Sequence, residues 1–466
     1  MKTKWRWHEI YGLFVGFTVT IFLFVFVATS FAEKQIQALV AGSTVFVALL
    51  AILIIFVSLK VKGTLEGLMT QRLILGSLAL FTFFVVLLFV PTQRDSDSQS
   101  CGTTEISEEQ DRYDARDQPG SDLYVKMSQS VHTDVLTLTI YDICVGKISY
   151  KVHRDGTVNL QRIEIINRAV LTEHIKDEAK SLGAKIVGIT ELEPEYVFTH
   201  DQAGNPITLT HKYAIIMGKD LRYMLAGPSA PMPWEHLYSS LPEELAAALS
   251  GQMIKSTVKI PEETIQEVKE TLKFFSEGGR TAVELAEYIR GLGYSARAHY
   301  QRWSEVQIVP LAIKAGLGEL GRNGMLLTME VGPRGSFSVV TTDLPLIPDK
   351  PVDLGIKEFC KVCKKCAQSC PVKAIPYGDP QIVRGVLKWP LDGDKCFKYL
   401  VSNPKCLACI ASCPYNKPGF FVHRLAAFLA SRKSIVANFV LVKLDDILGY
   451  GKIKVKQEEL NRGAGS

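Results

Sequence analysis

Eight of the ten cysteines fall in two adjacent runs whose spacing is typical of iron–sulfur ligands. The runs are Cys360-x2-Cys363-x2-Cys366-x3-Cys370-Pro371 and Cys396-x9-Cys406-x2-Cys409-x3-Cys413-Pro414. In the bacterial form of this motif, three cysteines bind one [4Fe–4S] cluster and the fourth binds a second cluster. The two runs therefore predict two [4Fe–4S] clusters and a role in electron transfer.

The crossed fourth cysteine suggests how the ligands divide between the clusters. One set is Cys360, Cys363, Cys366 and Cys413, and the other is Cys370, Cys396, Cys406 and Cys409. Other crossed assignments stay open. Zinc sites lack the Cys-x3-Cys-Pro ending, and spacings of two or three residues are too tight for bridges between distant loops. We therefore expect neither a zinc site nor a disulfide framework.

The chain of 466 residues has room for two or three domains, and its net charge of +5 is mild. Most of its hydrophobic excess lies in three uncharged apolar runs, at residues 10–31, 38–59 and 73–91. Each run is long enough to cross a bilayer as a helix. A cleavable signal peptide would not be followed by two more such runs, so residues 1–92 are predicted to be a three-helix membrane anchor.

The charges of the short loops indicate an orientation. Basic residues precede the first run and separate the second from the third, whereas the loop between the first two runs offers Lys34 alone; the basic residues are Lys2, Lys4, Arg6, Lys60, Lys62 and Arg72. The positive-inside rule then places the N-terminus in the cytoplasm and the catalytic part outside. Iron–sulfur clusters are normally assembled in the cytoplasm, which favours a catalytic part on the cytoplasmic side. We therefore expect the outside location from the loop charges and keep the cytoplasmic location as the alternative.

After the anchor, composition and periodicity divide the chain further. Residues 93–121 read as a polar linker, and residues 122–162 as a small strand-rich segment with a hairpin turn at Asp155-Gly156. Helices and strands alternate over residues 163–345, which predicts an α/β domain. The segment includes a helix ended by Gly183, strands at 184–190 and 212–221, and a helical stretch over 261–293 broken at Gly278-Gly279.

The cluster region, residues 346–418, follows as a ferredoxin-like domain, and residues 419–466 form a helical segment and tail. The apolar face of this helical segment could dock on the soluble part or lie on the bilayer surface. Cys101 and Cys144 lie outside the cluster runs and would bridge in an oxidising compartment or stay free in the cytoplasm.

Several stretches resemble the corrinoid-dependent reductive dehalogenases and their relatives, the epoxyqueuosine reductases. The matching segments include AKSLGAKIVGITEL (179–192), KYAIIMGKDLRYMLAGPSAP (212–231), PLAIKAGLGELGRNGMLLTMEVGPRGSF (310–337) and TTDLPLIPDKPVD (341–353). The resemblance implies a nitroreductase-like α/β domain that binds cobalamin without a histidine ligand, and an organohalide as substrate. Because epoxyqueuosine reductases are soluble tRNA-modifying enzymes, the predicted membrane spans favour the dehalogenase side.

The same resemblance points to residues that would hold the corrinoid. They are Tyr294, Gly316, Gly318, Gly321, Arg322 and Asn323. The three glycines match a dinucleotide-binding string, but they follow a helix-like segment where that motif requires a strand. They would let backbone approach a flat macrocycle, with Arg322 and Asn323 available to its amide and phosphate groups. The alternative is a plain helix-capping turn.

The resemblance also implies catalytic residues. Arg334 corresponds to the basic residue beside the substrate, where a cation favours a departing halide; a surface arginine is the alternative. Phe274 or Phe275 stands where the family has a proton-donating tyrosine. His299 and Tyr300 are the candidate substitutes, and either could equally be structural.

The implied partners follow from these features. We expect membrane lipid around the anchor, no nucleic acid, and an electron donor that is either in the membrane, as a quinol or redox partner, or a soluble reduced carrier. Two rival functions stay open: an electron relay with no active site of its own, and a corrinoid reductase acting on a substrate without halogen.

Overall fold

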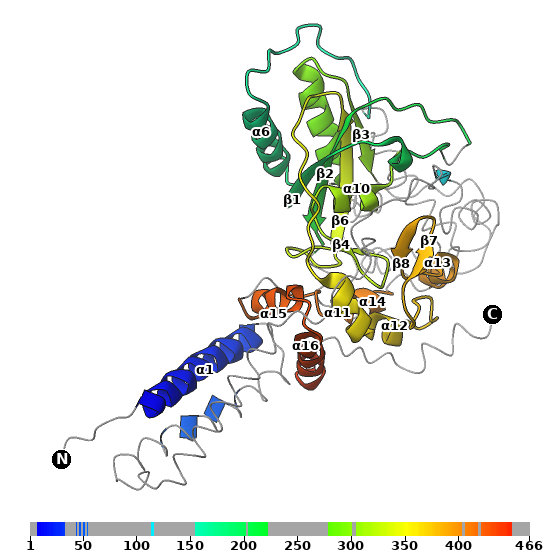
Figure 1. The fold of residues 1–466 in the computed structure, drawn as a ribbon. Helices are drawn as coiled ribbons and strands as arrows, with labels where there is room; N and C mark the ends of the chain where they lie inside the picture. Colours follow the sequence, from blue (N-terminus) through cyan, green and yellow to red (C-terminus); the bar gives the residue numbers. More distant parts are fainter. Residues whose placement is uncertain are drawn as a thin grey trace, which may run out of the picture. The chain divides into compact units, whose positions relative to one another are not determined.

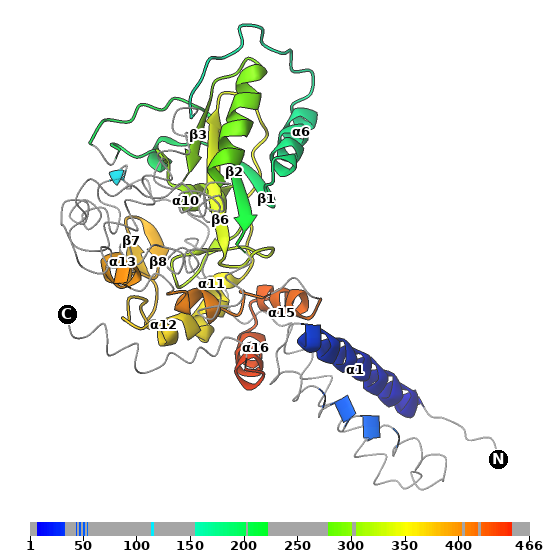
Figure 2. The ribbon, with the colours of Figure 1, turned by 180° about the vertical axis from the view of Figure 1, so that it is seen from behind.

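The computed structural model describes the chain at residues 7–32, isolated positions between 43 and 54, and residues 113–115, 154–201, 204–221, 278–300, 304–402, 406–417 and 421–449. The chain divides into two compact units. The larger comprises residues 97–357, 364–416 and 453–466, and the smaller comprises residues 1–96, 358–363 and 417–452. Figures 1 and 2 show the elements from opposite sides, and each unit is described by itself.

The larger unit is built around a four-stranded antiparallel sheet with strand order β1-β2-β6-β3. The strands are β1 (Ile186–Glu191), β2 (Tyr213–Asp220), β3 (Ala296–Tyr300) and β6 (Gly335–Thr342). Register pairs Ile215 of β2 with Val340 of β6, and Val340 with Ala298 of β3. Of the two central strands, β6 ends in four β-branched residues, Val339 to Thr342, and β2 contains Ile215 and Ile216, as expected for strands buried on both faces.

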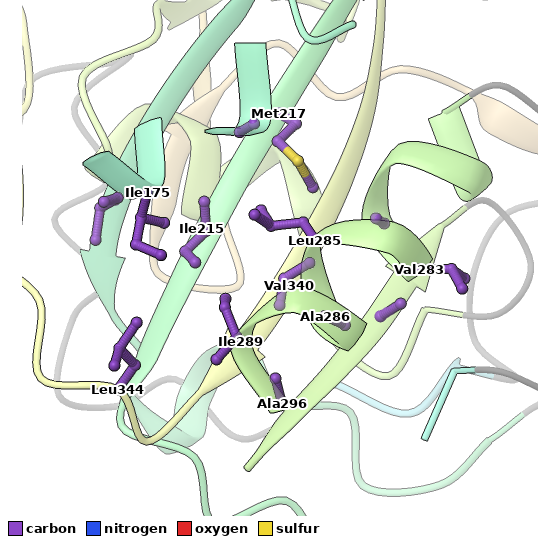
Figure 3. Close-up of a cluster of buried hydrophobic side chains, with 14 of the residues drawn as sticks. Ile175, Ile215, Met217, Val283, Leu285, Ala286, Ile289, Ala296, Val340 and Leu344 are labelled. Atoms are coloured by element: carbon purple, nitrogen blue, oxygen red, sulfur yellow. The ribbon is translucent and has the colours of Figure 1, made fainter. Parts of the chain in front are cut away.

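Helices cover both faces of this sheet. Helix α6 (Arg168–Ser181) and a helix over 278–291 pack on one face, and α10 (Ile308–Lys314) packs on the other. Alternate residues of β2 point to opposite cores: Ile215 and Met217 lie with α6, and Ala214 and Ile216 lie with α10. Figure 3 shows the first of these cores, in which side chains from β2, β6 and the two helices converge. The sheet with helices on both faces is the α/β arrangement that the alternation predicts.

Residues at the ends of α6 explain where this helix begins and ends. The Oδ1 of Asn167 accepts hydrogen bonds from the backbone N–H of Ala169 and Val170, which caps the start of α6. Gly183 has a φ of 101° just after the helix, a conformation that favours glycine. The predicted helix before Gly183 and the predicted strands at 184–190 and 212–221 are therefore confirmed as α6, β1 and β2.

The cluster region contributes short elements. They are α11 (Ile356–Cys363), α12 (Lys365–Ser369), β7 (Gln381–Val383), β8 (Val386–Lys388), α13 (Gly393–Ser402) and α14 (Ala408–Ala411). Strands β7 and β8 form a hairpin, and α12 lies against α14. Two further two-residue strands, β4 (Glu319–Leu320) and β5 (Leu326–Leu327), pair within the glycine-rich segment, and a 3-10 turn, η3 (Pro194–Tyr196), follows β1.

The smaller unit contains α1 (Trp7–Ala32), α15 (Phe421–Ser431) and α16 (Ile435–Ile447). Helix α15 contacts both α1 and α16, and Lys417 pairs with Asp445 at 3.2 Å. The helical segment predicted near the C-terminus is thus confirmed as α15 and α16.

The predicted membrane spans are described only in part. The run at 10–31 lies within α1, a few positions of the run at 38–59 are described, and the run at 73–91 lies outside the described residues. Counting only the positions that the structure describes, no helix is long and apolar enough to cross a bilayer. The three spans stay a prediction.

Several other predicted features also lie outside the described residues. These are the linker at 93–112 and 116–121, the segment 122–153, the stretch 261–277 with Phe274 and Phe275, and Cys101 and Cys144. Residues 154–162 are described, and they form a loop with bends and no strand. Asp155 and Gly156 lie in that loop, so the described part does not show the predicted hairpin.

Candidate iron–sulfur and corrinoid site

One predicted ligand set lies together within the larger unit. Cys370 follows α12, Cys396 lies on α13, Cys406 precedes α14 and Cys409 lies on α14. Cys370, Cys396 and Cys409 pack around a small apolar cluster that includes Ala367 and Ala374. The backbone N–H of Ala374 donates a hydrogen bond to the Sγ of Cys370 at 3.3 Å. This is the kind of N–H to sulfur bond that tunes iron–sulfur clusters.

The pKa shifts of three of these cysteines have two shared causes, burial and the proximity of the other thiols. Burial raises the pKa of Cys409 to about 12, and the proximity of Cys406, Cys396 and Cys370 adds to the rise. Burial also raises the pKa of Cys396 and of Cys406, again with Cys370 as a neighbour. The arrangement fits the predicted ligand set, because cluster binding requires four thiolates to approach one another and supplies the positive charge that holds them.

Among the described residues, no three His, Cys, Asp or Glu side chains converge as required for a single metal ion. A [4Fe–4S] cluster needs no such convergence, because each thiolate binds a different iron. All eight cysteines of the two runs are unbridged in the structure.

The other predicted set, with Cys360, Cys363, Cys366 and Cys413, is divided between the two units. Cys360 and Cys363 lie one turn apart on α11, so their side chains share a face of that helix. Their grouping with Cys366 and Cys413 stays a prediction.

The glycine-rich segment begins as a helix-capping turn. Gly316 follows α10 with a φ of 72°, and hydrogen bonds run from Gly316 N–H to Ile313 O at 3.0 Å and from Leu317 N–H to Ala312 O at 3.0 Å. This is the Schellman pattern of helix ends. Because the segment follows a helix and not a strand, it is not a dinucleotide-binding turn.

The three predicted glycines face protein atoms. A Cβ on Gly316 would lie 2.4 Å from Lys350 O, and one on Gly318 would lie 2.1 Å from Leu327 O. A Cβ on Gly321 would meet the side chains of Leu327 and Asn323. Close packing of this segment against its own chain therefore explains all three glycines, which favours the capping-turn alternative over contact with a macrocycle.

Arg322 connects the glycine-rich segment to the cluster region. Its Nη1 donates to the carbonyl oxygens of Pro376 and Gly378, each at 2.8 Å, and its guanidinium lies 4.4 Å from the centre of the Trp389 ring. The indole N–H of Trp389 donates to the same Gly378 oxygen at 3.0 Å. Arg322 is buried, so these contacts assign it a bridging role in the protein itself.

Asn323 is the predicted corrinoid residue with an unmatched donor. Its side chain is 5% exposed, its Oδ1 accepts from the Met325 N–H at 3.2 Å, and its Nδ2 has no hydrogen-bond partner in the described chain. A buried amide donor without a partner costs free energy, so a bound group with an acceptor oxygen would suit this position. A corrinoid, with its amide and phosphate oxygens, fits that requirement.

The same loop packs against the cluster region. Met325, two residues after Asn323, and Cys409 both pack against Leu407 and Ile410. A predicted cluster ligand, Cys409, and the loop that carries Asn323 thus pack on the same small apolar cluster. An electron on the second cluster would have a short path toward a group held by Asn323.

Arg334 is buried in an ion pair. Its Nε lies 2.6 Å from Oδ1 of Asp220, at the end of β2, and its Nη1 donates to Oδ1 of Asn416 at 3.3 Å. Asn416 in turn donates its N–H to Cys413 O at 2.8 Å. This burial excludes the surface-arginine alternative. The guanidinium of Arg334 is held by Asn416, which lies three residues after the predicted cluster ligand Cys413.

His299 occupies a structural position. It is fully buried, its Nδ1 accepts from the Glu305 N–H at 3.3 Å, and its Nε2 contacts Thr341 Oγ1 at 2.9 Å. Burial, with the nearby cations Arg154 and Arg297, lowers the pKa of His299 well below its ordinary value. A neutral imidazole with both nitrogens engaged favours the structural alternative over proton donation.

The two predicted tyrosines belong to the core beside α6. The Tyr300 ring packs beside Gly279, and the Tyr294 hydroxyl donates to Ile163 O at 3.4 Å with the Arg162 guanidinium 4.6 Å from its ring centre. The glycine-rich segment packs in the core beside α10, through Leu317 and Leu320. The structure therefore does not bring Tyr294 together with the other predicted corrinoid residues.

Four residues with a clear place in this arrangement gave no signal in the sequence: Asp220, Met325, Trp389 and Asn416. Each is an ordinary residue type outside a spaced motif. Their importance arises from contacts across sequence separations that only folding creates.

Comparisons with known proteins agree with this arrangement. A family model described as a 4Fe-4S dicluster domain matches residues 359–417. The tetrachloroethene reductive dehalogenase of Sulfurospirillum multivorans is 30% identical over 296 residues, which cover 60% of this chain and 57% of that protein. The epoxyqueuosine reductase of Cyclobacterium marinum is 33% identical over 138 residues, covering 25% of this chain and 39% of that enzyme.

Among solved structures, the catabolic reductive dehalogenase NpRdhA superposes with a TM-score of 0.59 at 26% identity, covering 78% of this chain and 49% of that chain. This chain spans a little over half the length of the curated dehalogenases that it matches, 57% of the Sulfurospirillum enzyme and 55% of one from Desulfitobacterium hafniense. The resemblance expected from the glycine-rich segment and the cysteine runs is confirmed, because the chain is similar to reductive dehalogenases in both sequence and fold.

Proposed function

We propose that this protein is an oxidoreductase that uses two [4Fe–4S] clusters and a corrinoid to remove halogen from a small organohalide. The observation that carries the proposal is the packing of Met325 and Cys409 on one apolar contact. It sets a cluster ligand beside the loop with the unmatched Asn323 donor. Similarity to reductive dehalogenases spans more than the cluster region, since it covers 60% of the chain.

The chain's residues would act as follows. Cys370, Cys396, Cys406 and Cys409 hold one cluster, and Asn323 Nδ2 donates to an amide or phosphate oxygen of the corrinoid. Arg334, held by Asp220, supplies a fixed positive charge toward the departing halide. A bound corrinoid supplies a reducing centre that can accept single electrons and cleave a carbon–halogen bond.

Two histidines near the sheet, His211 and His299, are engaged in hydrogen bonds. His211 contacts Thr341 Oγ1 and Ser295 Oγ, each at 2.8 Å, and both nitrogens of His299 are also engaged. Neither imidazole has a nitrogen available for cobalt without breaking these bonds.

The first test measures the metal content and the halide release of the purified protein. Protein purified without oxygen from cells supplied with corrinoid should contain about one cobalt per chain beside iron, and should release halide from an organohalide when reduced. Asn323→Leu should lower the cobalt content at unchanged iron content, because it removes the donor and leaves the cysteines intact. Iron-loaded protein without cobalt would reject the corrinoid part of the proposal and support an electron relay.

The similarity to an epoxyqueuosine reductase carries the second candidate, a corrinoid reductase whose substrate has no halogen. The two candidates differ in product. Cobalt-loaded protein that releases no halide from a panel of chlorinated and brominated alkenes and phenols, yet reduces an epoxide substrate, would establish the second.

We also propose that residues 1–92 anchor the enzyme in a membrane with the catalytic part outside the cytoplasm. The four large apolar side chains Phe14, Phe17, Ile21 and Phe24 of α1 are exposed at spacings of three and four residues, which places them along one side of the helix. Lipid is the partner that such a stripe suits, and a quinol or another membrane redox partner would then be the electron donor. External protease added to sealed cells should remove the catalytic part, and protection from that protease would reverse the orientation.

A further inference from the structure

Ser412, at the end of α14, carries a buried hydroxyl. Its side chain is 1% exposed, and its Oγ has no hydrogen-bond partner among the described residues. A serine at the end of a helix usually bonds a backbone carbonyl one turn earlier, or water. Among the described residues, no carbonyl accepts from the Ser412 hydroxyl, and an unmatched buried hydroxyl costs free energy.

The backbone places this hydroxyl on the same side of α14 as a cluster ligand. Ser412 has φ and ψ of −79° and −9°, and its N–H donates to Ala408 O at 3.1 Å, so it continues the helical geometry of α14. Residues three apart in a helix lie on one face, and Cys409 is three residues before Ser412. Cys409 is partly buried and packs against apolar residues of two clusters.

We propose that Ser412 donates a hydrogen bond from its hydroxyl to a sulfur of the cluster held by Cys370, Cys396, Cys406 and Cys409, and thereby raises the reduction potential of that cluster. Reduction adds negative charge to the cluster. A buried hydrogen-bond donor stabilises the reduced cluster more than the oxidised cluster, so it raises the reduction potential of the cluster. Ser412 touches no reacting atom of the substrate, so its role is to tune electron delivery.

This inference rests on the proposed iron–sulfur site, and the experiment separates the two. The midpoint potentials of both clusters would be measured by redox titration of the whole cluster-loaded protein, followed by electron paramagnetic resonance. Cys409→Ser identifies which signal belongs to the second cluster. Iron and sulfide analysis of every variant reports whether the clusters are present at all.

Ser412→Ala should make the second cluster's reduction less favourable by about tenfold, which is about 59 mV for a one-electron couple. Ser412→Thr keeps the hydroxyl and should restore most of the potential. Ser431→Ala is the matched control, because Ser431 also ends a helix but its hydroxyl already donates to Phe428 O at 2.8 Å. That variant should leave both potentials unchanged.

The outcomes are distinct. Wild-type protein without iron and sulfide would reject the iron–sulfur site itself. Full cluster content with an unchanged second potential in Ser412→Ala, or a shift confined to the other cluster, would overturn the role assigned to Ser412. Loss of the second cluster in Ser412→Ala together with an unchanged potential in Ser412→Thr supports a hydrogen bond that the cluster needs for stability as well as for its potential.

Discussion

Arg334 and Asp220 form a buried ion pair in which the arginine Nε lies 2.6 Å from the carboxylate Oδ1. Asp220 ends β2 and Arg334 immediately precedes β6, so the pair closes one end of the central two strands. The same guanidinium reaches Asn416, three residues beyond Cys413. One cation thus joins the sheet to the end of the second cysteine run.

Replacing one partner of this pair should be more harmful than replacing both. Asp220→Asn leaves a buried cation uncompensated and should reduce the free energy of unfolding by about 3–5 kcal/mol, as for other broken buried pairs. The double variant Arg334→Met with Asp220→Leu should recover much of that stability, because no buried charge is left. Urea unfolding followed by circular dichroism measures both.

Activity should separate the structural and chemical roles of Arg334. The double variant should stay folded with full iron content and lose halide release, because the cation near the departing halide is gone. Halide release at the wild-type rate in that variant would remove Arg334 from the proposed reaction.

The contact between Arg322 and Trp389 should hold the cluster region in place. Arg322→Lys keeps the charge but loses the planar group that bonds two carbonyls and stacks on the indole, so we expect a loss of about 1–3 kcal/mol. Hydrogen exchange of residues 376–389 should become faster. Lys395→Ala, at an exposed position of α13, is a control that should leave this exchange unchanged.

The glycine at 318 should tolerate no side chain. A Cβ there would lie 2.1 Å from the backbone oxygen of Leu327, so Gly318→Ala should destabilise the protein by about 3 kcal/mol. Gly291→Ala is the matched control, because a Cβ at that helical position meets no atom within 4 Å. It should be neutral or stabilising by up to about 1 kcal/mol. Equal effects of the two variants would contradict the close-packing explanation.

Loss of one cysteine from the second set should remove one cluster and leave the other. Cys409→Ser should lower the iron content by about half, since a [4Fe–4S] cluster depends on its thiolates. Cys101→Ser, outside both runs, should keep the full iron content. Iron analysis together with the visible spectrum under anaerobic conditions checks both variants.

The pH dependence of stability should contain a contribution from His299. Burial lowers the pKa of His299 in the folded state, so below its ordinary pKa of about 6.5 the unfolded chain takes up a proton that the folded chain does not. Stability is therefore lost as pH falls below about 6.5. His299→Gln should lose about 1 kcal/mol less than the wild type between pH 7 and pH 5.5, measured by urea unfolding. An identical loss in both proteins would show that His299 is charged in the folded state.

Short-range patterns in the sequence predicted much of the scaffold. Asn167 and Gly183 mark the ends of α6, and alternating apolar residues mark β1 and β2, because caps, turns and strand periodicity depend on near neighbours. The cysteine spacing predicted the iron–sulfur chemistry for the same reason, since cluster ligands come largely from one short segment.

The assignments that failed or changed depend on contacts between distant segments. The sequence could not show that Gly316 and Gly318 face Lys350 and Leu327 of this same chain, or that His299 lies in the core with both nitrogens engaged. From the sequence alone, any arginine, glycine or histidine is a candidate to bind a ligand. Its actual partners are decided by packing.

The sequence by itself therefore determined the cofactor chemistry of the cysteine runs, the alternation of helices and strands, and the resemblance to the dehalogenases. Only the tertiary structure decided that Asp220 neutralises Arg334, that Trp389 holds Arg322, and that Met325 lies with Cys409. The physical reason is that burial changes what a side chain can do. A buried charge needs a partner and a buried donor needs an acceptor, and those partners come from parts of the chain that sequence spacing does not connect.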